Sequence, residues 1–121
     1  MRIAGIWDDT QTLLADATVG PSSPVVSGFR YQTITPIVLM PGTTYTIGAV
    51  YTSTDDDAYI SGASGLTTAT EVVWMNAVYP SGGSLGFAYP TMDSAASSQG
   101  RFGPNFLFTV VPVELQSFTV E

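Results

Sequence analysis

Short runs in which apolar and polar residues alternate are distributed along most of the chain. In Tyr45–Tyr51 the odd-numbered positions are apolar or aromatic, and the positions between them are mostly small or polar. Because successive side chains of a strand point to opposite faces, this pattern predicts a half-buried strand. Comparable runs predict strands at residues 2–7, 12–19, 25–34, 43–51, 70–79, 84–88, 104–111 and 113–120.

Helical patterns are almost absent. The best helical candidate, residues 10–18, has no apolar stripe with a period of 3.6 residues. Clusters of Gly, Pro, Ser and Asp separate the predicted strands at short intervals, which is typical of sandwiches and barrels. We therefore predict an all-β fold, specifically an antiparallel β-sandwich that is jelly-roll-like.

Two segments make sharper predictions. In MPGTTY, Pro41 and Gly42 predict a type II turn that joins Ile37–Met40 to the strand at 43–51, since Pro fixes φ and Gly supplies φ > 0. The run EVVWMNAVY is apolar at both alternating sets of positions, which predicts a central strand covered on both faces, with Trp74 in the core. The Ser-, Thr-, Gly- and Asp-rich stretches 52–70 and 91–100 predict long loops, where a binding function would lie.

Composition limits the partners. The chain has 121 residues, enough for one domain, and carries ten acidic residues against three arginines, a net charge of −7. Nucleic acids and anionic membrane surfaces require clustered cations, so neither is expected as a partner. Apolar runs such as Val110–Val113 are far shorter than the ~18 residues of a membrane span, so no membrane insertion is expected.

The residue types that are missing limit the chemistry. The sequence has no His, no Cys and no Lys. It therefore cannot build a Ser-His-Asp or Cys-His arrangement, the usual zinc ligand set, a disulfide or a lysine Schiff base. We expect a protein that is not an enzyme, with no catalytic residues and no cofactor, and a ligand-binding site that the sequence does not identify.

Acidic residues form two candidate sites. Asp8-Asp9 lies between two strand-like runs, and we interpret it as a hairpin turn stabilised by Asp side chains. The alternative is a carboxylate pair of the kind that glycosidases use, formed by Glu71 with Asp93 or Asp8. Asp55–Asp57 is interpreted as a solvated loop tip, with calcium binding as the alternative, although the spacing does not match an EF-hand loop.

Three tyrosines are candidates for a sugar-binding platform. Tyr51, Tyr59 and Tyr89 are predicted at strand ends or in loops, where a ring could stack on a sugar. The alternative is that each ring packs at the edge of the core while its hydroxyl contacts water. An extracellular glycan and a second copy of the chain are the partners that the sequence leaves open.

Three segments, GIWDDTQTLLADATV, GFRYQTITPIVLMPGTTYTIGAVY and RFGPNFLFT, occur in an order and spacing that resembles a bacterial domain family of unknown function. Members of that family are predicted secreted or surface β-sandwich modules, often in proteins with a PEP-type C-terminal sorting signal. The resemblance covers about residues 5–109. It implies an extracellular or cell-surface location, and it assigns no catalytic residues.

The two ends of the chain depart from the family pattern. Only Met1–Ala4 precede the first of the three segments, where the family has further strands, so we expect a piece of a longer protein. Residues 1–111 are predicted to form the sandwich domain, and 112–121 a C-terminal strand or a linker to a following domain. Because a sandwich that lacks an early strand has an open edge, the strand at 113–120 is expected to fill it, in the same copy or in a neighbour.

Overall fold

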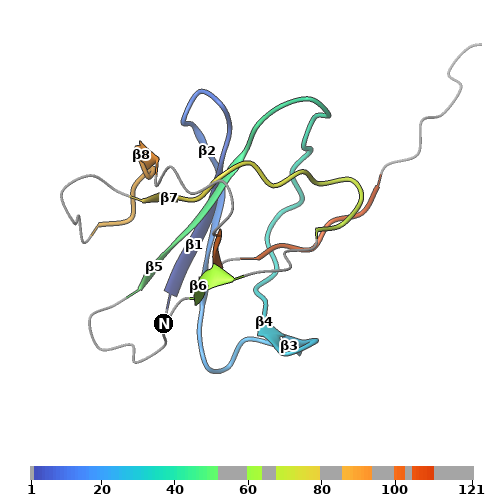
Figure 1. Ribbon diagram of the computed structural model, residues 1–121. Helices are drawn as coiled ribbons and strands as arrows, with labels where there is room; N and C mark the ends of the chain where they lie inside the picture. Colours follow the sequence, from blue (N-terminus) through green and yellow to red (C-terminus); the bar gives the residue numbers. More distant parts are fainter. Residues whose placement is uncertain are drawn as a thin grey trace, which may run out of the picture.

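The computed structural model describes residues 2–51, 60–63, 68–79, 86–93, 100–102 and 105–110 (Figure 1). Every regular element in these residues is a β-strand, and every strand pairing is antiparallel, which confirms the all-β prediction. The strands are β1 (Arg2–Trp7), β2 (Leu13–Val19), β3 (Val25–Val26), β4 (Phe29–Arg30), β5 (Thr46–Tyr51), β6 (Ile60–Ala63), β7 (Val78–Tyr79), β8 (Met92–Asp93) and β9 (Gly100–Phe102).

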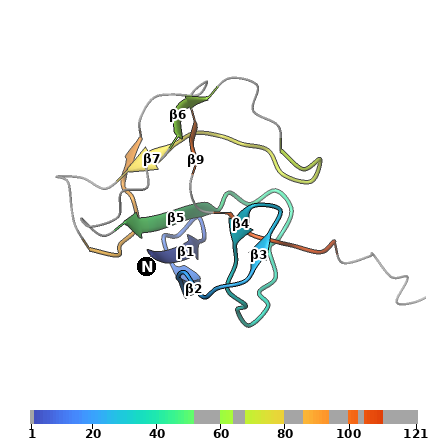
Figure 2. The same cartoon turned by 90° about the horizontal axis from the view of Figure 1, so that it is seen from below.

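The largest sheet has three strands in the order β2-β1-β5 (Figures 1 and 2). β1 matches its predicted limits, and β2 and β5 form within the predicted ranges 12–19 and 43–51. In register, Gly5 of β1 lies between Asp16 of β2 and Gly48 of β5. The register between β1 and β2 shifts after Ile6, at the end next to the turn. Local alternation was therefore sufficient to identify these three strands.

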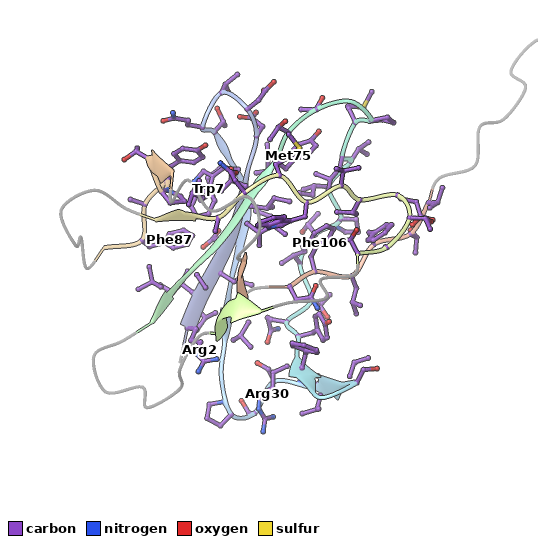
Figure 3. All side chains as sticks on the ribbon, in the orientation of Figure 1. Arg2, Trp7, Arg30, Met75, Phe87 and Phe106 are labelled. Atoms are coloured by element: carbon purple, nitrogen blue, oxygen red, sulfur yellow. The ribbon has the colours of Figure 1, made fainter. Side chains whose placement is uncertain are left out.

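The small core is built on the end of β1. Gly5, Ile6 and Trp7 are buried, and the Trp7 side chain is only 4% exposed. A Cβ atom placed on Gly48 would lie 3.2 Å from Cζ3 of Trp7, so the indole covers the paired glycines. Glycine inside a strand commonly marks such a close approach. Phe87 also lies over Gly5 and packs against the indole, with the ring centroids 5.2 Å apart (Figure 3).

Residues 25–30 form a hairpin and 31–34 form no strand, in place of the single strand predicted at 25–34. Ser27 and Gly28 both have positive φ angles, 50° and 85°, which is the geometry of a two-residue hairpin turn. The turn reverses the chain, so β3 pairs with β4. The prediction was wrong because Ser27-Gly28, inside this strand-like run, was not interpreted as a turn.

The Pro41-Gly42 turn has the predicted sign of φ, 78° at Gly42. The Met40 N–H donates a hydrogen bond to the Tyr45 hydroxyl across the turn, at 2.8 Å. Residues 37–40, however, are not a strand. The turn therefore leads into β5 from residues that form no strand.

The predicted central strand at 70–79 is reduced to β7. The Val72 N–H bonds to the Ala69 carbonyl, and the Val72 carbonyl accepts a hydrogen bond from the Thr68 hydroxyl, so a local turn uses the backbone groups that a strand would pair. Val73 is 80% exposed, and Trp74 is half-buried and not in the core. The prediction that both faces of this strand are covered was therefore wrong.

Two short strands lie where loops were predicted, and β9 begins at the last residue of the second predicted loop. β6 lies within 52–70 and pairs with β9, and β8 lies within 91–100 and pairs with β7. Residues 86–88 and 105–110 are not strands, contrary to the predictions for 84–88 and 104–111. The predicted strand 113–120 and the proposed domain boundary after 111 lie outside the described residues.

Candidate functional site

The Asp8-Asp9 segment forms the turn between β1 and β2. Oδ1 of Asp8 accepts three hydrogen bonds, from the Thr10 N–H at 2.9 Å, the Thr10 hydroxyl at 2.7 Å and the Thr12 N–H at 3.0 Å. The backbone N–H of Asp8 donates to the Thr12 carbonyl at 3.0 Å. Gln11, with φ of 66°, completes the reversal. This geometry supports the interpretation of Asp8 as a structural turn residue.

The charge state of Asp8 fits the same role. The hydrogen bond from the Thr10 hydroxyl, and after it the one from the Thr12 N–H, lower the pKa of Asp8 below its ordinary value. A general acid in a glycosidase needs a raised pKa, which is the opposite shift. Asp8 is therefore held as a carboxylate whose strongest contacts are with its own turn.

The other acidic candidates do not form a described cluster. Glu71 is exposed and lies in the segment 68–79, which leads into β7. In the parts of the chain that the structure describes, no three acidic residues gather closely enough to hold a metal ion. Asp93 belongs to β8, and Asp55–Asp57 lie outside the described residues.

Of the three candidate tyrosines, only Tyr89 has a described side chain. Its ring meets the Trp7 indole edge-on, with the centroids 6.1 Å apart and the planes at 81°. Its hydroxyl lies 3.4 Å from Oγ1 of Thr46. Tyr89 thus belongs to the edge of the core, as the alternative interpretation predicted. Tyr51 ends β5, and Tyr59 lies outside the described residues.

The most distinctive surface is one that the sequence analysis did not single out. We call residues 25–40 together with 105–110 the acid-free surface, because Arg30 is the only charged residue in these two segments. Nine of its large apolar side chains are exposed: Val25, Val26, Phe29, Ile34, Val38, Met40, Leu107, Phe108 and Val110. The available signal was the distribution of charge, since the chain carries no Asp or Glu between Asp16 and Asp55 or between Asp93 and Glu114.

A hydrogen bond joins the two segments of the acid-free surface. Nδ2 of Asn105 donates to the Tyr31 hydroxyl at 3.0 Å. Beyond this bond the rings of Phe106 and Phe108 contact each other, with the centroids 5.7 Å apart. Figures 1 and 2 both show residues 105–110 crossing the segment that follows β4. The nine side chains are therefore carried by two segments that meet at this crossing.

Comparison of the chain with protein-family models, with curated proteins and with solved structures finds no match. In the described part of the chain, no helix has the length and apolar character needed to cross a membrane.

Proposed function

We propose that this protein is a non-enzymatic structural or adhesive module that acts outside the cell or at its surface and joins to further copies of itself. In this proposal the strands belong to a jelly-roll-like antiparallel β-sandwich, and copies join by strand exchange into an oligomer or filament. The extracellular location rests on the family resemblance of the three sequence segments and on the low content of charged residues, 11%.

The observation that carries the proposal is the balance of buried and exposed apolar residues. Apart from Gly5 and Pro90, the buried apolar residues of the described part of the chain are Ile6, Trp7 and Ala77, whereas twelve large apolar side chains are exposed. Soluble monomers rarely expose large contiguous apolar areas, and those that do commonly use them for association. A protein with this balance is suited to joining other molecules.

The side-chain chemistry supports a joining role more than a reactive one. The chain has no imidazole, thiol or lysine amine, and the pKa of Asp8 is lowered by its own turn. Tyr89, a candidate for sugar binding, packs against Trp7. Both observations favour the structural module over a glycosidase or a sugar platform at Tyr89.

Sedimentation velocity over about 1 to 100 µM protein tests the proposal, because mass action makes self-association depend on concentration. We expect the weight-average sedimentation coefficient to rise with concentration. A glycan array probed with the same protein should give no signal. A species that stays monomeric over the whole range would refute self-assembly, and specific glycan signals would establish a carbohydrate-binding module instead.

A further inference from the structure

We propose that the acid-free surface, residues 25–40 and 105–110, is where a second copy of this chain docks. This inference rests on the self-assembly proposed above and assigns it to a place. Nine of the twelve exposed large apolar side chains lie there, with a single charged residue, Arg30. Depletion of charge in an apolar patch is characteristic of the centre of a protein interface.

The β3–β4 hairpin presents part of this surface on a fixed base. The Arg30 guanidinium donates to the Ser23 carbonyl at 2.9 Å, and the Tyr31 N–H donates to the Pro24 carbonyl at 2.9 Å. Ser23 is buried, and its hydroxyl accepts a hydrogen bond from the Gly20 N–H. A docking element that is already ordered loses less conformational entropy on binding. The hairpin is therefore preorganised for a partner.

The segment after the hairpin offers backbone groups as well as side chains. Residues 32–39 form no strand, and in the described structure none of their backbone groups bonds to another part of the chain. An extended segment of this kind can pair with a strand from another molecule, which adds main-chain hydrogen bonds to apolar contacts. Pro36 interrupts the series of donors, so pairing is expected on either side of it.

Charge favours a second copy at this surface over contact elsewhere. Each copy carries a net charge of −7, so two copies repel each other wherever acidic residues meet. The acid-free surface is a region where they approach without placing acidic residues of its two segments in contact. An anionic membrane is a poorer occupant, because Arg30 alone cannot supply the cluster of cations it needs.

Matched substitutions test the assignment by sedimentation velocity on the full chain. Val38→Glu and Leu107→Glu place an acid on the surface at side chains that are 75% and 65% exposed, and Val73→Glu places the same charge outside it at a side chain that is 80% exposed. We expect the two surface variants to weaken self-association by roughly tenfold or more. Val73→Glu should leave it near the wild-type value, and added salt should strengthen wild-type association by screening the acidic charges.

A second measurement does not depend on the glutamate variants folding. Because the chain has no cysteine, Val38→Cys and Val73→Cys each supply a single thiol. We expect alkylation of the Val38→Cys thiol to slow at assembling concentrations, while that of Val73→Cys stays constant. Two outcomes would refute the assignment while leaving self-assembly in place. In the first, the wild-type chain assembles but Val73→Glu weakens self-association as much as the surface variants do. In the second, the wild-type chain assembles but the Val38→Cys thiol is not protected from alkylation. A monomeric wild-type chain would refute both proposals.

Discussion

Adding one methyl group at Gly5 tests whether the Trp7 core is packed as the structure shows. A Cβ atom there would lie 2.6 Å from Cζ of Phe87 and 3.1 Å from Cη2 of Trp7, whereas carbon atoms in contact are separated by about 3.5–4.0 Å. Overpacking of this kind costs about 1–3 kcal/mol. Replacing a strand glycine by alanine also returns about 0.5–1 kcal/mol of backbone entropy. We therefore expect Gly5→Ala to destabilise the chain by about 0.5–2 kcal/mol.

Two other glycines make this a graded series. At Gly48 the added Cβ would meet only the Trp7 ring, at 3.2 and 3.7 Å, so a smaller cost is expected than at Gly5. At Gly20 nothing lies within 4 Å, so Gly20→Ala should be neutral or should stabilise the chain by up to about 1 kcal/mol. Gly20→Ala should therefore be the most stable of the three variants, Gly48→Ala intermediate and Gly5→Ala the least stable.

Urea unfolding followed by tryptophan fluorescence and far-UV circular dichroism measures the series, at one fixed protein concentration because association would add stability. Phe87→Leu, which removes the ring atom nearest Gly5, should recover part of the loss in a double-mutant cycle. Two results would refute the packing of Phe87 over β1. Gly5→Ala could be as stable as the wild type, or Gly5→Ala could lower the free energy of unfolding by the same amount in the Phe87→Leu background as in the wild type.

Three further predictions concern turns and buried polar groups. Folding lowers the pKa of Asp8, so its carboxylate stabilises the folded chain above its ordinary pKa, and this contribution is lost as the pH falls through the lowered pKa. Asp8→Asn should thus lower the melting temperature at neutral pH and should change it little in strong acid. Asp9→Asn removes no hydrogen bond of the described structure, so this control should change the melting temperature little at either pH. Ser23→Ala removes the acceptor of the Gly20 N–H and should cost about 1–2 kcal/mol in urea unfolding. Gly42→Ala places a residue with a side chain at a backbone φ of 78° and should lower the free energy of unfolding by about 1–2 kcal/mol. If this variant is as stable as the Gly20→Ala control, the turn geometry at Gly42 is wrong.

Local signals in the sequence determined the all-β character, the limits of β1 and the conformation of two turns. Alternation over six or seven residues is sufficient for an antiparallel strand with one covered face, and Asp8 forms its hydrogen bonds within four residues. The Pro41-Gly42 turn likewise depends only on the φ preferences of its own residues. Such features depend on neighbours in the chain, so a sequence without any alignment reveals them.

Only the tertiary structure decided what covers each apolar residue. Residues 71–79 have the composition of a buried strand, yet a turn at Val72 replaces strand pairing there, only Val78–Tyr79 pair as a strand, and Val73 is exposed. Trp7 is buried because Phe87, eighty positions later in the chain, reaches it over the paired glycines of β1 and β5. Composition shows how much apolar surface a chain carries, but which part is covered depends on contacts between distant segments. The lack of acids at 25–40 and 105–110 is visible in the sequence, whereas only the fold shows that their apolar side chains are exposed and that the two segments meet.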